Sequence, residues 1–299
     1  MDPENTTDGV KIVPCDVCGA NDAEEIVVAR EYMTGPMHVC RNCGLCYIRE
    51  RRSTFDVAEG WTRSYTGPYN QYSAAVAAQH AFIARYLELT VGLRGSRVVD
   101  IGAGEGKLGE LLDSKGAITW SVEPSPFNCA FNKSNHVHMG TIEDFQGLEG
   151  LFDICVMNFT LECTADPRGM LARCHALLKP GGVALVCTGS RVMAPLTRPL
   201  WQYLSKQPPD EHPLRFTPIS LENIFKVSAF EPVKNATYAD LGLLMQVGRR
   251  AEKPIHTLTR EKYEDVIAFF EHWHRASTAR EPDTGNAGGP VADIQGAPV

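Results

Sequence analysis

The sequence predicts an α/β fold in which parallel strands alternate with helices along most of the chain. Short, β-branched apolar runs such as Val98–Ile101 predict buried parallel strands. Apolar residues three and four positions apart, such as Leu108, Leu111 and Leu112, predict the helices that follow them. Turns rich in glycine and proline separate these segments. The 299 residues leave room for one large domain and a small module.

Composition limits the function and the compartment. The net charge of −7 disfavours a non-specific grip on nucleic acid. There is no apolar run of membrane-spanning length, and the polar start Met1–Gly9 does not resemble a signal peptide, so we expect a cytoplasmic protein. In such a compartment the ten cysteines favour free thiols and metal binding over disulfides.

The N-terminal part predicts a small metal module over residues 11–50, after a disordered leader at residues 1–10. Two Cys-x-x-Cys pairs, each followed by a glycine, have the pattern of a closed four-cysteine zinc site. Their members are Cys15, Cys18, Cys40 and Cys43. We expect a structural zinc ion, and a hairpin through residues 26–28 and 37–39 between the pairs. Cys46 is more simply a buried cysteine.

Residues 51–94 predict a linker or lid that leads into a helix. The segment is polar with scattered aromatic residues, among which Tyr65 and Tyr69 are candidates to cover a ligand. Packing between the two modules explains these tyrosines equally well. Residues 73–92 have helical apolar spacing, and His80 lies on the apolar stripe, where a core position is favoured over a catalytic one.

The predicted core starts near residue 95 with a strand, a glycine turn and a helix. Gly102, Gly104 and Gly106 allow a sharp turn and close approach of a ligand to the backbone. The next predicted strand, residues 117–122, ends at Glu123, about where an acid would hold ribose hydroxyls. The Gly-x-Gly-x-Gly spacing and the two acids Asp100 and Glu123 favour a cationic nucleoside over a dinucleotide.

The rest of the core, residues 95–250, continues the alternation. Predicted strands cover residues 136–139, 154–157 and 183–187, with a helix from residue 167 to 178, an edge hairpin at 231–238 and 241–247, and a final helix at 258–275. An irregular segment at about 189–218 is the predicted substrate cap. Within it His212 is the best candidate for a general base, although it could equally cap the next helix. We expect residues 251–276 to hold the C-terminal helix and residues 277–299 to be disordered.

Together these segments resemble the class I S-adenosylmethionine-dependent methyltransferases. The resemblance is carried by the turn within Val98–Leu112, by Glu123, by Leu151–Asn158, and by Leu177–Val186 with its Pro-Gly-Gly turn. It implies a Rossmann-like sheet of seven strands with helices on both faces, here preceded by the zinc ribbon. The implied reaction is methyl transfer from S-adenosylmethionine.

The resemblance also implies roles for single residues. Glu123 would bind the ribose, Asp100 would orient the turn or the cofactor's amino group, and Ile142 and Glu143 would contact the adenine. Asn158 would face the methionine part or the reacting methyl group, and so would act with His212 in catalysis. The full set implied for the cofactor is Asp100, Gly102, Ala103, Gly104, Gly106, Glu123, Pro124, Ile142, Glu143 and Asn158, with Tyr65 and Tyr69 as the lid.

The expected acceptor is a small molecule methylated on carbon or oxygen. A zinc module ahead of such a core resembles the methyltransferases that modify sugars and other small metabolites. One alternative is a zinc-finger methyltransferase of ribosomal RNA guanine, against which the acidic charge weighs. Another is a non-catalytic protein that binds the cofactor and docks a partner. We expect no membrane partner, and a homo-oligomer is left open.

Overall fold

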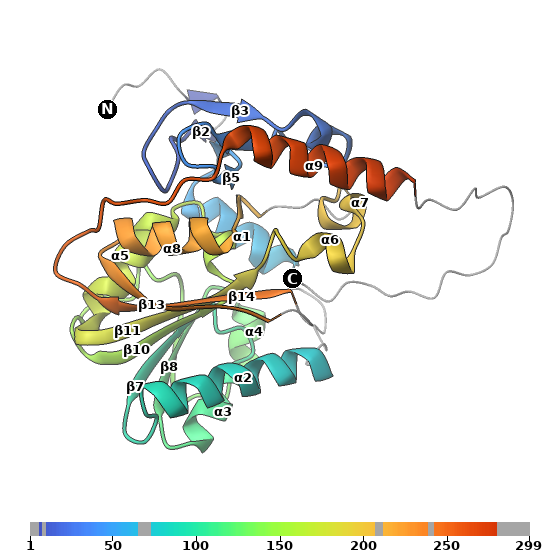
Figure 1. Ribbon diagram of the computed structural model, residues 1–299. Helices are drawn as coiled ribbons and strands as arrows, with labels where there is room; N and C mark the ends of the chain where they lie inside the picture. The colour runs from blue at the N-terminus through green and yellow to red at the C-terminus, as the bar shows by residue number, and fades with distance from the viewer. Residues whose placement is uncertain (1–5, 8–9, 65–72, 207–211, 239–241, 280–299) are drawn as a thin grey trace, which may run out of the picture.

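A twisted seven-stranded sheet forms the centre of the molecule (Figure 1). The computed structural model describes residues 6–7, 10–64, 73–206, 212–238 and 242–279. The strands in spatial order are β13 (Phe230–Tyr238), β14 (Leu243–Arg250), β11 (Leu178–Gly189), β10 (Phe152–Asn158), β7 (Arg97–Ile101), β8 (Ile118–Glu123) and β9 (His136–Met139). From β11 to β9 all neighbours run parallel, whereas β14 is antiparallel to β11 and to β13. The predicted Rossmann-like sheet is confirmed.

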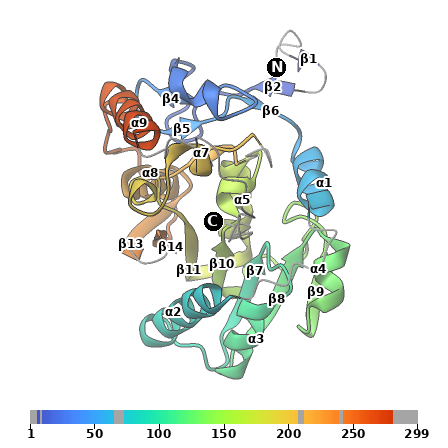
Figure 2. The same ribbon diagram turned by 90° about the vertical axis from the view of Figure 1, so that its right-hand side faces the viewer.

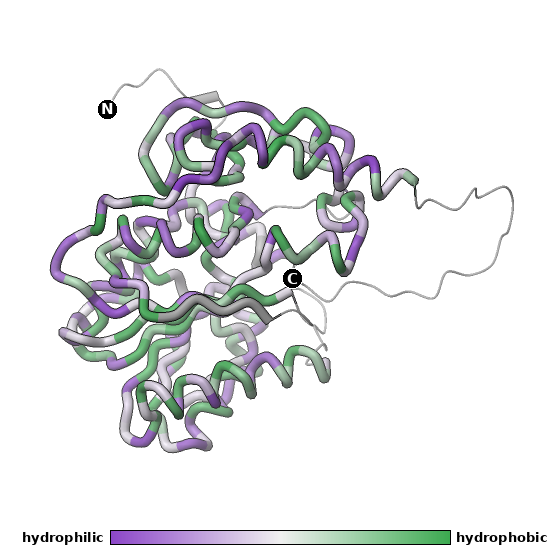
Figure 3. The backbone as a smooth tube through the Cα atoms, viewed as in Figure 1, coloured by the Kyte–Doolittle hydropathy of each residue, from purple (hydrophilic) through white to green (hydrophobic). Residues whose placement is uncertain are grey.

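Helices cover both faces of this sheet (Figure 2). On one face lie α2 (Ala74–Thr90) and α3 (Lys107–Ser114), and on the other lie α5 (Pro167–Leu177) and α8 (Pro218–Val227), while α4 (Pro126–Phe131) follows β8. Side chains of β10 alternate between the faces: Ile154 and Val156 join the cluster under α2 and α3, and Cys155 and Met157 join the one under α5 and α8. Hydrophobic residues, drawn in green, accordingly lie along the central strands (Figure 3).

The N-terminal module contains two small sheets. Strands β1 (Thr6–Thr7), β2 (Val10–Ile12) and β6 (Glu50–Arg51) form one, so part of the expected leader pairs with the module. Strands β3 (Ala23–Glu25), β4 (His38–Cys40), β5 (Cys46–Tyr47) and β12 (Leu214–Arg215) form the other. The hairpin partner predicted at residues 26–28 is wrong, because β3 pairs with β4 and residues Val27–Glu31 form the 3-10 helix η1.

Segments from the far end of the chain complete this module. Helix α9 (Tyr263–Thr278) lies along it beside the short helices α6 (Ala194–Thr197) and α7 (Leu200–Tyr203) (Figure 1). The predicted start of this helix at Leu258 is wrong, because α9 begins at Tyr263. The Asn223 side chain accepts from the N–H of Thr259 (3.2 Å) and donates to its carbonyl (2.6 Å), so this backbone is held out of a helix.

Part of the predicted linker is helical. Helix α1 covers Thr54–Ser64, and the Ser53 hydroxyl accepts a hydrogen bond from the backbone N–H of Asp56 at its start. Tyr65 and Tyr69, the predicted lid residues, lie outside the described residues. Among the residues that are described, no helix is both long enough and apolar enough to cross a bilayer.

Helix α9 should contribute strongly to stability through Phe270, which is 0% exposed, whereas Phe55 on α1 is 73% exposed. We expect Phe270→Ala to lower the free energy of unfolding by about 3–5 kcal/mol, because it leaves a cavity in the core of the module. Phe55→Ala, the control, should change it by less than about 0.5 kcal/mol. Urea unfolding followed by fluorescence measures both. Equal effects of the two substitutions would show that α9 does not pack on the module.

Candidate functional site

The site lies where the order of the parallel strands reverses. From β7 the chain proceeds outward to β8 and β9, and then returns to β10 on the other side of β7. In such sheets ligands bind outside the carboxyl ends of the two central strands. The glycine turn follows β7 at this edge, and Asn158 ends β10 at the same edge.

The predicted glycines have the backbone conformation that only glycine adopts easily. Gly102, Gly104 and Gly106 have φ values of 70°, 54° and 75°. A Cβ atom on Gly102 would lie 2.3 Å from the Thr160 hydroxyl, and one on Gly106 would lie 2.3 Å from the Asn132 side chain. At Gly104 no atom of the described residues lies within 4 Å of that position, so among them the turn presents open backbone there.

Glu123 is the best-anchored acid of the site. Its carboxylate accepts from the backbone N–H of Gly104 (2.8 Å) and of Ser125 (2.9 Å), and from the Asn128 amide (3.3 Å). Burial raises the pKa of Glu123, and these three donors lower it. Each carboxylate oxygen has further lone pairs, so Glu123 can still accept from ligand hydroxyls.

Asp100 lies buried behind the turn. Burial, followed by the charge of Glu123, raises the pKa of Asp100 to about 7. A buried carboxyl of this kind is stabilised in its ionised form by a nearby cation, and so by a ligand with a positive charge.

At the end of β10 the structure places a histidine that sequence analysis assigned to the core. The Asn158 amide nitrogen lies 3.3 Å from Nε2 of His80, which comes from α2. Burial lowers the pKa of His80 to about 4, so its ring is neutral at pH 7. The Asn158 Oδ1 atom is buried and has no hydrogen-bond partner among the described residues. His80 was missed as a site residue because its apolar stripe is the ordinary signal of a core position.

The loop that we predict to contact adenine contains one buried apolar side chain and one buried acceptor atom. Ile142 is buried, and the Oε2 atom of Glu143 is buried without a hydrogen-bond partner in the part of the chain that the structure describes. Ala103 and Pro124, which flank the turn and the ribose acid, are both partly exposed.

A second acid that sequence analysis did not select lies beyond Asn158. Glu162, in the 3-10 helix η2 (Leu161–Cys163), is 5% exposed. His212, the predicted base, is partly exposed, precedes β12, and lowers the pKa of Glu162 by its charge. The structure therefore brings His212 to the segment that follows β10. An acid after a strand has no pattern of its own, so no sequence signal identified Glu162.

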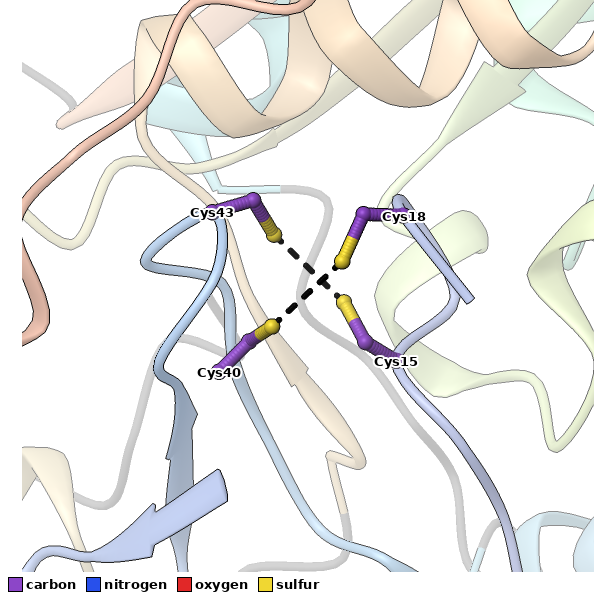
Figure 4. A group of neighbouring side chains, drawn as sticks. All are labelled: Cys15, Cys18, Cys40 and Cys43. Carbon is purple, nitrogen blue, oxygen red and sulfur yellow. Dashed lines mark hydrogen bonds between the residues drawn. The ribbon is translucent and has the colours of Figure 1, made fainter. Parts of the chain in front are cut away.

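The four cysteines of the N-terminal module point toward a common centre (Figure 4). Their sulfur atoms all lie within 4.8 Å of one another, with 3.5 Å between Cys15 and Cys43 and between Cys18 and Cys40. These separations are far longer than a disulfide bond. Tetrahedral zinc with bonds of about 2.3 Å would place the sulfurs about 3.8 Å apart, so the arrangement fits a zinc ion.

Two buried contacts connect these cysteine loops to the core. Arg51 forms an ion pair with Asp16, inside the first loop, at 2.6 Å and also donates to the carbonyl of Ala165 beyond η2. The second loop is held by Glu261, whose N–H donates to the carbonyl of Cys43 and whose carboxylate accepts from Arg191 and Thr217. The module therefore lies against the same end of the molecule as Glu162 and His212.

Comparison with known proteins agrees with this geometry. Residues 71–235 match a family model described as a methyltransferase domain. Over 115 residues the chain is 34% identical to a ubiquinone biosynthesis O-methyltransferase of Coxiella burnetii, which covers 36% of this chain and 49% of the relative. The corresponding protein of Pseudomonas aeruginosa is 28% identical, with 36% and 50% covered. The chain thus spans about half the length of the curated relatives it matches.

Solved structures share the fold. The 1,6-didemethyltoxoflavin-N1-methyltransferase of Burkholderia thailandensis, solved with S-adenosylhomocysteine, superposes with a TM-score of 0.54 at 17% identity, covering 77% of this chain and 100% of that one. A possible histamine N-methyltransferase of Thermotoga maritima gives 0.52 at 20% identity, covering 65% and 99%.

Gly104 offers a test of the turn that separates fold from ligand binding. Gly104→Ala introduces a methyl group into open space, so it should cost about 1–2 kcal/mol of backbone strain but leave the fold intact. Because that methyl group would occupy the ligand's approach, we expect the affinity for S-adenosylmethionine to fall at least about tenfold. Gly92→Ala, at φ 88° with no neighbour within 4 Å, is the matched control and should keep full affinity. Calorimetry and thermal melting measure both; equal affinity of the two variants would place the ligand elsewhere.

Proposed function

The chain belongs to the methyltransferase domain family, and from this premise we propose that it transfers a methyl group from S-adenosylmethionine to a small molecule. The observation that carries the proposal is the hydrogen bond from the Gly104 N–H of the glycine turn to Glu123, at the edge of the sheet where the strand order reverses. When bound, S-adenosylmethionine supplies a methyl carbon already activated by its sulfonium charge.

The residues around the turn fit this cofactor. Glu123 would accept from the ribose hydroxyls, and Asp100 would stabilise the positive charge of the methionine part. Glu143, through its unpartnered Oε2, would accept from the adenine amino group, and Ile142 would pack against the ring. Asn158, whose Oδ1 is also unpartnered among the described residues, would orient the methionine end.

The chain's own work in the reaction is positioning and proton removal. Methyl transfer needs the acceptor atom in line with the methyl carbon, which is an orientation effect. Where the acceptor atom carries a proton, His212 would take it, because a neutral imidazole accepts protons near pH 7. His80 contacts Asn158, but with a pKa of about 4 it is the weaker base.

For the acceptor we propose oxygen or carbon of a small metabolite. The relatives named as ubiquinone biosynthesis O-methyltransferases support a hydroxyl acceptor. The resemblance of the cysteine module to that of sugar-modifying methyltransferases supports a sugar or another secondary metabolite. The net charge of −7 disfavours an RNA acceptor. We also propose that the protein works in the cytoplasm.

Calorimetric titration with S-adenosylmethionine and S-adenosylhomocysteine tests this function. We expect micromolar binding by the wild type, and binding about 10–100-fold weaker for Glu123→Ala, because a charged hydrogen-bond acceptor is lost. Glu149→Ala removes an exposed carboxylate that pairs with Arg173 and should bind normally. Catechols and nucleotide sugars would then be screened for methylated product by mass spectrometry. No binding by folded wild-type protein would refute the proposal; binding without product in any acceptor pool would favour a non-catalytic role.

We propose that the four cysteines hold one structural zinc ion. A site with four thiolates has no open position for a substrate, so the ion would stabilise the module and take no part in methyl transfer. The two buried contacts through Arg51 and Glu261 would carry that stability to the core.

Metal analysis of protein purified without added zinc should find about one zinc per chain. Cys40→Ser removes one ligand and should lower both the zinc content and the melting temperature, because metal binding contributes folding energy. Cys129→Ser changes a thiol outside the cluster and is the control. Retention of a full equivalent of zinc by Cys40→Ser would refute the assignment.

A further inference from the structure

Glu162 is a buried acid without an evident structural purpose. It lies in η2, just beyond the carboxyl end of β10, and is 5% exposed. Neither of its carboxylate oxygens meets the geometry of a hydrogen bond with a donor in the described ranges of the chain. A buried polar group without a partner costs free energy, so its presence calls for an explanation.

Three other acids with little exposed surface are matched by donors. Asp16 accepts two hydrogen bonds from Arg51. Glu261 is paired with Arg191 and accepts from Thr217, and Glu123 accepts from three N–H groups at the cofactor turn. Glu162 differs from these three because it has no such donor among the described residues, and it lies just beyond the carboxyl end of β10, the edge of the sheet where ligands bind in α/β folds.

The groups that act on the pKa of Glu162 come from two other segments. Burial raises the pKa of Glu162, and His212, Thr188 and Arg215 lower it. Thr188 lies near the end of β11, the strand next to β10, so it belongs to the same edge of the sheet. The thiol of Cys187 lies close as well, since the charge of Glu162 adds to the burial that raises the pKa of Cys187.

The backbone that carries His212 is fixed from both sides. Strand β12, which starts two residues later, pairs with β5 of the cysteine module and contacts η2. The Arg215 guanidinium donates to the carbonyl of His212 at 2.7 Å, and its charged end lies 5.4 Å from the centre of the Tyr203 ring. The position of His212 beside η2 therefore follows from the pairing of β12 with the module.

We propose that Glu162 is a positioning residue, whose buried carboxylate orients the His212 imidazole so that its other ring nitrogen faces the acceptor. This rests on the proposed function and deepens it. Neither carboxylate oxygen has a donor among the described residues, so Glu162 would accept from one imidazole N–H after rotation of the His212 ring, which would leave the second nitrogen as the proton acceptor. A carboxylate that accepts from one imidazole N–H is the usual way in which enzymes fix the tautomer of a histidine base.

A hydroxyl acceptor would lose its proton as its oxygen gains the methyl group. The acceptor oxygen forms a bond to the methyl carbon while the bond from that carbon to sulfur breaks, and its electron pair stays on the sulfur. The hydroxyl proton moves to His212, and Glu162 stabilises the resulting imidazolium. That proton then leaves to water, which restores the neutral ring.

Nitrogen NMR of the full chain tests the contact without any acceptor. We expect Glu162→Gln, which keeps the shape but not the charge, to change the ring nitrogen shifts of His212 and to leave those of His80 unchanged. His212→Asn assigns the signals. It should also raise the pH at which the Glu162 carboxyl titrates, because the imidazolium charge that lowers its pKa is gone. Unchanged His212 signals in Glu162→Gln would overturn the proposal.

Kinetics supply the second readout, with a catechol or nucleotide sugar that the acceptor screen shows to be methylated. Glu162→Gln should lower kcat at least about tenfold and leave the Kd for S-adenosylmethionine within about twofold. The double variant with His212→Asn should be no slower than His212→Asn alone, since the two residues act as a unit. If the losses of kcat in the two single variants multiply in the double variant, or if Glu162→Gln loses affinity for the cofactor, the proposal is overturned.

Glu149→Gln is the control. Failure of cofactor binding by the wild type would refute the proposed function, whereas the NMR result would still decide the contact.

Discussion

The site depends on one close contact between two loops. Gly102 follows β7 and Thr160 follows β10, and the missing side chain of Gly102 is what lets the loops meet. The Thr160 hydroxyl donates to the carbonyl of Ile101 at 2.9 Å, which ties the second loop to the end of the first strand. Asn158 and Glu162 stand on either side of Thr160, so this contact sets where they lie relative to the glycine turn. A side chain at residue 102 would separate the proposed cofactor half of the site from its proposed acceptor half.

The two halves differ in how their acids are stabilised. Three N–H groups, from Gly104, Ser125 and Asn128, donate to the Glu123 carboxylate, so its position is fixed without a ligand. Asp100 and Glu162 are buried without comparable support, and burial raises the pKa of each. A site with such groups is organised around charges that arrive with its ligands or form during the reaction.

Much of the cofactor half could be predicted from local patterns. The strand before Gly102, the three glycines and Glu123 lie close together in the sequence, and the chemistry of each follows from residue type and spacing. The cysteine cluster was predictable for the same reason, since each pair is local and the pairs match. The edge hairpin followed from its own apolar pattern, and the seven-stranded sheet followed from the resemblance to a known family.

The acceptor half could not be predicted in this way, because distant segments build it. His80 reaches Asn158 only because α2 packs across β10, and nothing local distinguishes it from a core histidine. The segments that carry Glu162 and His212 lie together because β12 contacts η2 and pairs with β5 of the N-terminal module. The start of α9 was misplaced because a side chain of α8, Asn223, holds the preceding backbone extended.

The joining of β12 and α9 to the N-terminal module has a consequence for synthesis. Residues 23–47 are made well before their small sheet gains its fourth strand, β12, and before residues 194–204 and α9 cover its apolar side. Until then the cysteines and the apolar surface beside them stay open on the nascent chain, at the stage when chains are most prone to aggregate. The module is therefore synthesised before the segments that complete it, and capture of a metal ion at the proposed zinc site would protect it during that interval.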